Sequence, residues 1–394
     1  MRLTSVSRAL VVAIVGALLL SSLACFGGSK RARRYQKAEL QEALGRLETP
    51  GLVIGEFTLA KNAVVDGDTI KVAGLDSSLR LCNLDTEETF KNEADRRLFE
   101  SGWENYLSTK QGQSSRPIKA ATPMGEAAKE FAKKFFEGVD VVRLERDHPK
   151  EIRDRYNRYL AYVFARKNGE WVNYNVEAVR AGMSPYFTKY GYSRRFHDLF
   201  AQAQREAQQK ELGIWNPNTL HYRDYVQRLE WWDARADFLM EFETEAAGKE
   251  NYIDLSHWDA MRRLEKYEGR EVVVFGAIEE IILGDKGPTR VKLSRRMGGA
   301  FPLIFFDKDV FGSSHIARYA GEYVRVKGTV TRYRSRFGRE ELQIVVNFPG
   351  QVRGSDKVPN FTGVNPEGTG RGNDDGEDVE APPAEEKKEE ANAP

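Results

Sequence analysis

Short runs in which apolar and polar residues alternate dominate much of the chain after residue 56. This period of two is typical of β-strands that bury one face, whereas apolar residues spaced three and four positions apart indicate helices. The pattern predicts strands at 57–65, 69–72, 79–84, 139–144 and 160–164, and helices at 125–136, 172–181 and 194–209. Strands grouped with a few helices between and after them indicate a small β-barrel capped by helices, an α+β fold.

The strand pattern returns nearer the C-terminus, after a stretch at 221–268 that is predicted to be helical. Five more strands are predicted at 271–282, 290–293, 302–306, 323–333 and 341–348, with a helix near 310–319. Five strands joined by glycine-rich turns within so short a stretch are typical of a Greek-key barrel, the OB-fold. The second half is therefore predicted to form an OB-like barrel of its own.

The remaining stretches have little apolar pattern. Residues 90–122 are charged and unpatterned, and from residue 354 the chain consists mainly of Gly, Pro, Asp and Glu. A segment with almost no large apolar residue cannot bury a core, so this tail is predicted to be disordered. We divide the chain into a leader at 1–25, a tether at 26–54, a first barrel domain at 55–218, a helical connector at 219–268, a second barrel at 269–353 and an acidic tail at 354–394.

The first 25 residues have the composition of an export signal. Arg2 and Arg8 precede an apolar run, and small residues lead up to Cys25. This order is typical of a secretory signal peptide, and a cysteine at the cut site predicts lipidation of its thiol. Plain secretion is one alternative, and an uncleaved anchor is another, because residues 9–26 are uncharged and just long enough to span a membrane. We expect a protein of the bacterial cell envelope, attached to the membrane through lipid on Cys25.

Composition excludes several classes of protein. The 394 residues include 60 Lys plus Arg and 59 Asp plus Glu, so the near-neutral charge excludes a uniformly basic nucleic-acid coat protein. Two cysteines and five histidines exclude a disulfide-rich scaffold and zinc fingers. An excess of positive charge is confined to one segment. Residues 270–353 include 15 basic and nine acidic residues, and arginines alternate with aromatic residues at 332–339. Such interleaving favours single-stranded nucleic acid as a ligand of the second barrel, with a protein-docking barrel as the alternative.

Two acidic residues mark strand ends in the first barrel. Asp68 lies at one end of a predicted strand, and Asp85 ends a neighbouring one. Two carboxylates with a backbone carbonyl nearby suit Ca²⁺, which prefers oxygen ligands and tolerates irregular geometry. Arginines cluster at 153–158, and a planar guanidinium holds two phosphate oxygens at once. This combination is suited to phosphate chemistry beside a metal ion.

Three motifs follow one another in the first barrel domain. They are Asp-Gly-Asp-Thr at 66–69, an arginine followed by Asp-Thr-x-Glu at 80–88, and Asp-x-Tyr-x-Arg-x-Leu-Ala-Tyr at 154–162. Their order resembles the staphylococcal nuclease (thermonuclease) family, and Leu-Gly-Ile-Trp at 212–215 is similar to the end of that domain. The resemblance covers residues 55–217 and implies an OB-type five-stranded barrel with helices.

The resemblance also implies roles for the acidic residues of these motifs. Asp68 and Asp85 would be the Ca²⁺ carboxylates, and Thr86 would offer its carbonyl oxygen. Glu88 matches the glutamate that orients or deprotonates the attacking water. Glu87 stands where family members often have proline, so the loop that holds Glu88 is expected either to be less rigid or to add a carboxylate near the metal.

Basic and aromatic residues are carried over in the same way. Arg80 and Arg158 match the arginines that neutralise charge on the five-coordinate phosphorus. Charge stabilisation of this kind raises the rate because the charge builds up in the transition state. Tyr186 and Lys189 fall near family residues that contact the nucleotide, within a looser match.

The resemblance implies a calcium-dependent endonuclease that hydrolyses DNA and also RNA and leaves 3′-phosphates. We expect it to prefer single strands. The second barrel would add affinity for nucleic acid, and the sequence indicates no protein partner. Two alternatives of another class are a nucleic-acid-binding module that kept the fold without catalysis, and an envelope scaffold. The charged stretch at 90–122 is longer than a compact family member needs, and we expect it to act as a lid, a specificity element or a disordered decoration.

Overall fold

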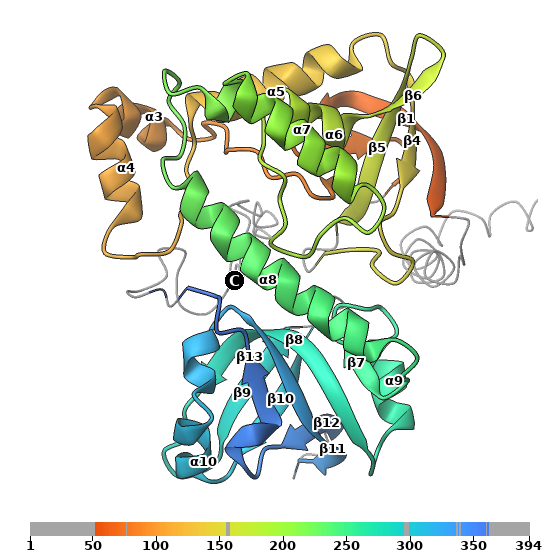
Figure 1. Ribbon diagram of the computed structural model, residues 1–394, viewed down its shortest axis with the longest axis vertical. Helices are drawn as coiled ribbons and strands as arrows, with labels where there is room; N and C mark the ends of the chain where they lie inside the picture. The colour runs from red at the N-terminus through yellow and green to blue at the C-terminus, as the bar shows by residue number, and fades with distance from the viewer. Residues whose placement is uncertain are drawn as a thin grey trace, which may run out of the picture.

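Two five-stranded barrels, joined by one long helix, make up the protein (Figure 1). The computed structural model describes residues 52–75, 77–154, 158–294, 299–335, 338, 340–359 and 361. The predicted leader with Cys25, the tether up to residue 51 and the tail from residue 362 lie outside these residues. No helix within the described ranges combines the length and the apolar composition needed to cross a membrane.

The first barrel closes through a parallel pair of strands. Its strands run in the order β3-β2-β1-β4-β5, and β3 pairs with β5 through Leu79 opposite Tyr159. Fully buried side chains such as Ile70, Leu144 and Val163 fill its interior. The strands are β1 (Val53–Val64), β2 (Thr69–Val72), β3 (Leu79–Leu81), β4 (Val141–Glu145) and β5 (Tyr159–Lys167), with β6 (Glu170–Asn173) added beside β5.

The helix α5 (Pro123–Phe136) sets the position of the loop that follows β3. Its first turn is capped by Thr122, whose side chain accepts a bond from the Gly125 N–H. A Cβ atom on Gly125 would stand 2.0 Å from the carbonyl oxygen of Glu88, so glycine allows the helix to lie directly against that loop. The other helices of this domain are α3 (Glu93–Glu100), α4 (Trp103–Gln111), α6 (Tyr174–Arg180), α7 (His197–Gln209) and the short η1 (Gly213–Trp215).

The stretch at 90–122, which has no clear pattern in the sequence, contains helices α3 and α4. Both are short, and their apolar side chains pack mainly on one another, with the ring of Phe99 5.9 Å from Trp103 and 6.0 Å from Tyr106. Tyr106 is fully buried in this cluster, which also includes Tyr222 and Tyr225 from the far side of the domain. Because the stretch packs into a core, the expectation of a disordered decoration is wrong.

The connector is dominated by α8 (Tyr225–Ala246), which crosses between the two barrels (Figure 1). Large buried residues lie along it, as expected for a helix covered on more than one side. Trp232 meets Phe187 of the first domain with ring centroids 4.8 Å apart, and Phe242 stacks on Phe275 of the second at 4.7 Å. The helix therefore belongs to the packing of both barrels.

The prediction that residues 221–268 are helical throughout is wrong for their middle part. After α8 the chain forms a short strand, β7 (Tyr252–Asp254), and then α9 (Ala260–Lys266). β7 pairs in parallel with β8, with Ile253 opposite Val274. Tertiary pairing decides this segment, because three residues are too few to show a strand period in the sequence.

The second barrel repeats the circuit of the first. β10 pairs in parallel with β12, and β11 closes the barrel against β8. In both barrels the third and fifth strands are therefore parallel neighbours, with helices inserted between the third and fourth strands, as in the OB-fold. The elements are β8 (Glu271–Ile282), β9 (Thr289–Ser294), β10 (Ala300–Phe305), α10 (Lys308–Ser313), η2 (Ile316–Tyr319), β11 (Tyr323–Arg334), β12 (Glu340–Val345), η3 (Pro349–Gln351) and β13 (Val352–Gly354).

Two predicted domain boundaries differ from the structure. β1 begins at Val53, two residues inside the predicted tether. The predicted disordered tail begins within β13, and two of its apolar residues pack on α8. Val358 is buried beside Trp231, and the ring of Phe361 meets the same indole edge-on at 4.9 Å. Isolated apolar residues in a polar segment give no sequence pattern, so this docking was not predictable from periodicity.

Candidate active site

Charged side chains from three segments meet at one end of the first barrel. Asp66 and Asp68 stand in the turn between β1 and β2, Arg80 lies on β3, and Asp85 follows that strand. Backbone bonds close the turn, with the Val65 N–H donating to the Thr69 carbonyl at 3.0 Å. The four charged residues are each no more than 7% exposed. The turn thus brings carboxylates next to an arginine in a nearly dry setting.

Gly67 is needed for this close packing. A Cβ atom there would stand 2.7 Å from Cγ2 of Thr86 and 2.8 Å from Cβ of Ala128. The Tyr174 hydroxyl donates to the Gly67 carbonyl at 2.7 Å and fixes the turn from the other side. The Asp-Gly-Asp motif therefore sits wedged between the loop after β3 and helix α5.

Arg80 joins the two predicted metal carboxylates. Its guanidinium forms an ion pair with Asp68 and donates from Nη2 to Oδ1 of Asp85 at 2.7 Å. Burial alone would raise the pKa of Asp68, but the neighbouring cations of Arg80 and Lys119 lower it overall. The two carboxylates come from different segments, yet they lie within the span of one guanidinium.

This donor set suits a hard divalent cation. Asp68 and Asp85 offer carboxylate oxygens, and Thr86, 5% exposed, follows directly in the same loop. Oxygen-only ligands are those that Ca²⁺ prefers, and no imidazole or thiolate is among them. Burial and the adjacent Asp68 carboxylate raise the pKa of Asp66 well above its ordinary value, and Asp66 accepts a bond from the Asp68 N–H at 3.3 Å. Asp66 thus acts as a turn residue beside the ligands.

Glu88 is the most accessible of the site carboxylates. Its side chain is 20% exposed, and one oxygen lies 3.4 Å from the Lys91 ammonium. Its backbone is held by α5, because the Thr122 N–H donates to the Glu88 carbonyl at 2.9 Å. Burial raises the pKa of Glu88, and the Lys119 cation opposes the rise. A positioned carboxylate with a raised pKa and access to solvent suits a general base.

Arg158 stands at the start of β5, oriented by a neighbouring carboxylate. Its Nε donates to Oδ2 of Asp154 at 2.7 Å, and its backbone N–H donates to Oδ1 at 2.9 Å. Arg158 is 5% exposed and contributes to the lowered pKa of Asp68. The two arginines predicted from the motifs therefore both act electrostatically on the same carboxylate.

Glu87 faces away from the site, so the expectation that it adds a carboxylate near the metal is wrong. It is 2% exposed and accepts bonds from the Tyr222 N–H and the Tyr225 hydroxyl, both at 2.7 Å. The Thr122 hydroxyl donates to its other oxygen. These bonds tie the loop to the starts of α5 and α8, so the loop is anchored where the sequence suggested a loss of rigidity.

Lys119 was missed from the sequence. Its ammonium donates to Oδ1 of Asp85 at 2.9 Å, and its side chain is 13% exposed. It comes from the end of the stretch at 90–122, so this stretch contributes a cation to the site. A lone lysine in an unpatterned segment carries no signal of its own; only its position just before Thr122, the cap of α5, marks it in retrospect.

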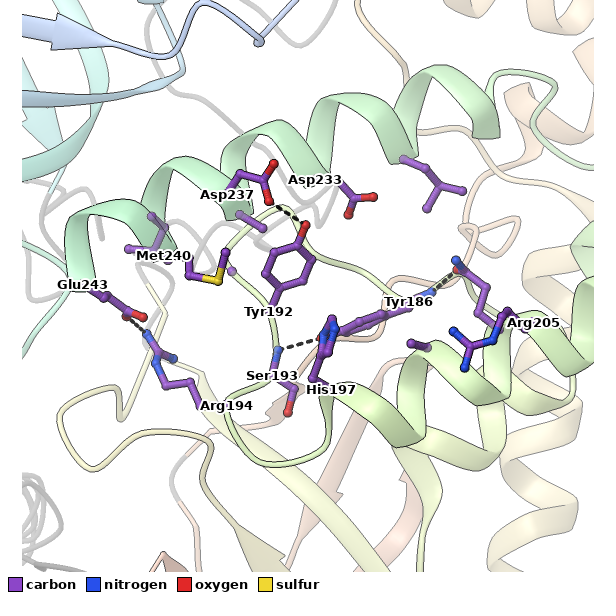
Figure 2. A pocket seen from close by; sticks show the side chains of 16 residues that line it. Tyr186, Tyr192, Ser193, Arg194, His197, Arg205, Asp233, Asp237, Met240 and Glu243 are labelled. Carbon is purple, nitrogen blue, oxygen red and sulfur yellow. Dashed lines mark hydrogen bonds and ion pairs between the residues drawn. The ribbon is translucent and has the colours of Figure 1, made fainter. Parts of the chain in front are cut away.

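The two predicted nucleotide contacts, Tyr186 and Lys189, lie on either side of Phe187 in the loop before α7. Tyr186 lines a cavity of about 630 Å³ between the 186–197 loop, α7 and α8 (Figure 2). Its ring stacks on Phe200 at 4.9 Å, and its hydroxyl accepts the Ser193 N–H at 2.7 Å. Carboxylates of α8, among them Asp233 and Asp237, face this cavity, which Arg194 and Arg205 also line (Figure 2).

Lys189 is 6% exposed, with its ammonium 5.0 Å from the Trp231 ring centroid. Its carbonyl accepts a bond from Arg235 of α8 at 3.0 Å. Phe187, between the two predicted contacts, is nearer the site: the Arg80 guanidinium lies 5.9 Å from its ring centroid. The contacts described for Tyr186 and Lys189 thus place them in the packing around α8, and Phe187 borders the Arg80 cluster.

Comparison with known proteins agrees with the family resemblance that the motifs show. The family described as staphylococcal nuclease homologue matches residues 78–217. A thermonuclease of Staphylococcus intermedius is 34% identical over 165 residues, which are 41% of this chain and 78% of that relative. An uncharacterized protein of Methanocaldococcus jannaschii is 32% identical over 162 residues, 39% of this chain and 69% of the relative. An uncharacterized endonuclease of Haemophilus influenzae is 39% identical over 67 residues, 17% of this chain and 33% of its own length.

Proposed function

The chain belongs to the staphylococcal nuclease family and is a nuclease, and from that premise we propose that it is a Ca²⁺-dependent enzyme that cuts single strands of DNA and RNA at the Arg80 cluster. One observation carries the proposal: Arg80 spans Asp68 and Asp85, two carboxylates from separate segments of the barrel. With the carbonyl of Thr86, these carboxylates would hold the ion, which supplies positive charge to the phosphodiester and lowers the pKa of nearby water.

The chain's own residues supply the remaining steps. Glu88 accepts a proton from water as the water oxygen bonds to phosphorus. The bond from phosphorus to the 5′ oxygen breaks, and this oxygen takes a proton from water and leaves as a hydroxyl, so a 3′-phosphate remains, as expected from the family. Arg80 and Arg158 stabilise the negative charge that builds up on the phosphoryl oxygens, and Lys119 adds a third cation beside Asp85. Because these groups are nearly buried, their charges act in a low-dielectric setting, where they have the largest effect.

Calcium dependence is tested by cleavage of labelled single-stranded DNA by the full chain, in Ca²⁺ or in excess EGTA. We expect cutting only with Ca²⁺, and a loss of about 10²-fold or more for Asp85→Asn, since a metal ligand supplies several kcal/mol of transition-state stabilisation. Asp309→Asn, at the exposed start of α10, is the matched control and should cut like the unmodified chain. Equal cutting in EGTA would overturn the calcium assignment.

We further propose that the second barrel adds affinity for single-stranded nucleic acid, chiefly through exposed rings. Phe306 and Phe348 are 68% and 59% exposed and follow β10 and β12, which are parallel neighbours. Charge contributes less than composition indicates, because Arg332 donates to Glu268 at 2.6 Å and Arg325 is buried against α8. Rings at the same edge of a barrel offer the stacking platform that single strands need.

Stacking is tested by measuring the affinity of an oligothymidine for a chain with Phe306→Ala and Phe348→Ala. Each stacked base is worth roughly 1–3 kcal/mol, so we expect binding to weaken about 5- to 150-fold per ring. Leu283→Ala, which removes an apolar side chain that is 68% exposed, should leave the affinity unchanged. Unchanged affinity in the double variant would instead favour a protein ligand for this barrel.

We also propose export and lipid anchoring through Cys25, on the strength of the apolar leader that precedes it. Expressed in a bacterium, the chain is expected to partition with membranes and to incorporate radiolabelled fatty acid. Cys25→Ser should abolish incorporation, whereas Cys82→Ser, the other cysteine of the chain, should not. Membrane association without label in the unmodified chain would point to an uncleaved anchor.

A further inference from the structure

Two histidines and a glutamate meet where the first barrel joins the connector. His148 and Glu151 follow β4 of the first barrel, whereas His257 lies between β7 and α9. The two imidazoles stack with their centroids 4.8 Å apart and their planes 15° from parallel. One ligand atom from each of the three residues lies within 4.8 Å of the other two. The cluster lies outside the Arg80 site and shares no residue with it.

The His257 ring lacks the partners that a buried imidazole needs. Both of its ring nitrogens are buried, and neither has a hydrogen-bond partner. An oxygen of Asp254 lies 4.0 Å from Nε2 of His257, too long for a hydrogen bond. An unsatisfied buried polar group costs roughly 1–3 kcal/mol, so such a group in a folded protein calls for a ligand or partner.

Both rings are in the protonation state that metal binding requires. Burial lowers the pKa of His148 and of His257 to about 4 each. At neutral pH both imidazoles are therefore uncharged, and each keeps a nitrogen lone pair.

We propose that His148, Glu151 and His257 bind a transition-metal cation of the zinc class and so tie the first barrel to the connector. Two imidazoles and a carboxylate, with a fourth position left for water, form a recognised tetrahedral zinc ligand set. Nitrogen donors select this class over Ca²⁺, so the site is chemically distinct from the oxygen-only Arg80 cluster.

The surroundings permit the exchange of partners that binding needs. Arg194 donates to Glu151 at 3.1 Å but also pairs with Asp147 and Glu243, so it keeps carboxylate partners when Glu151 turns to a metal. The Lys150 N–H donates to Nδ1 of His148 at 3.2 Å, a long bond that a metal would replace.

The two segments are already aligned without a metal. The Trp258 N–H donates to the Lys150 carbonyl at 3.2 Å, and the Lys150 ammonium pairs with Asp259 at 3.0 Å. Both bonds join the segment after β4 to the residues that follow His257. The ligands are therefore held in place by the backbone, which reduces the entropy lost on binding.

The test is calorimetric titration of the full chain with ZnCl₂ in excess Ca²⁺, which keeps the carboxylate site occupied. We expect one zinc per chain and a higher melting temperature with zinc. His148→Gln and His257→Gln should each weaken zinc binding about 100-fold, since ligand loss costs at least as much as loss of an outer partner. His315→Asn, at an exposed position whose φ of 52° suits asparagine, should bind zinc normally.

A second measurement needs no variant that alters the site. The chain has only five histidines, so their ring ¹⁵N resonances are few enough to resolve in the unmodified protein. On addition of zinc, the ¹⁵N resonances of two rings should shift. Both should still be present, and shift in the same way, in the His315→Asn variant, which shows that neither belongs to His315. The proposal is overturned if zinc binds no tighter than roughly 10 µM, if the two glutamine variants bind zinc as the unmodified chain does, or if other rings shift.

Discussion

Replacing Glu88 with Gln is expected to slow cleavage of single-stranded DNA by about 10³-fold while leaving affinity for the substrate nearly unchanged. Glutamine has the shape of glutamate but cannot accept a proton from water. Glu88 is the carboxylate of the site with the most exposed side chain, and its backbone is held by Thr122 at the cap of α5, so the substitution should not disturb the loop. The substitution should therefore lower kcat and leave substrate binding nearly unchanged.

The measurement is a single-turnover time course in saturating Ca²⁺, paired with an equilibrium titration of the same labelled strand. Glu130→Gln, on the exposed face of α5, is the matched control and should cut at the normal rate. Unchanged cleavage by the Glu88 variant would assign the base elsewhere. An unmodified chain that binds the strand in Ca²⁺ without cutting it would instead favour the non-catalytic binding module.

Local pattern predicted much of the fold. The run at 271–282 predicts a strand with the bounds of β8, because it is rich in β-branched and apolar residues and is bounded by glycine-containing turns. β7 and the docked residues after β13 have no such signal: three strand residues and two isolated apolar side chains form structure only through tertiary contact. The helices at 93–111 were missed because, with eight and nine residues, each is too short to show a clear helical period among its many polar and charged residues.

The residues of the candidate site also fall into those that the sequence could predict and those that it could not. Asp68 and Asp85 could be proposed together because they stand at the ends of strands that are close in sequence, whereas Arg80, within β3, was proposed from the family resemblance. Lys119 could not, since it reaches Asp85 only after two intervening helices have folded. His148 and His257 are more than a hundred positions apart and meet through the packing of separate domains. The sequence pattern therefore predicts which residues stand at a strand end, but it does not predict which distant residues reach that end in the folded protein.

Replacing Arg235 with Met is expected to destabilise the protein by about 3–5 kcal/mol. Arg235 lies on α8 with its side chain 2% exposed and pairs with Glu322 of the second barrel, which is equally buried. It also donates to the carbonyls of Lys189 in the first domain and Gly321 in the second, at 3.0 and 2.9 Å. The substitution leaves the Glu322 carboxylate buried with the Trp231 N–H at 3.1 Å and the more distant Arg116 guanidinium at 3.5 Å as its remaining donors.

Removing both charges should lower the free energy of unfolding less than removing Arg235 alone. The double variant Arg235→Met, Glu322→Gln leaves no buried charge without its partner, so we expect it to recover part of the lost stability. The measurement is chemical unfolding followed by tryptophan fluorescence, since Trp231 and Trp232 lie at this junction. Arg332→Ala, which breaks a well-formed but exposed pair with Glu268, should shift the unfolding midpoint little.

Two results would contradict the argument: a loss below about 1 kcal/mol for the single variant, or a double variant that is less stable than the single one. The expected result has a consequence for function. Lys189 follows Phe187, which borders Arg80, so the same arginine that joins α8 to the second barrel also fixes the backbone next to the nuclease site. Loss of Arg235 should therefore loosen the edge of the site as well as the junction, and cleavage should decline at temperatures where the barrels are still folded.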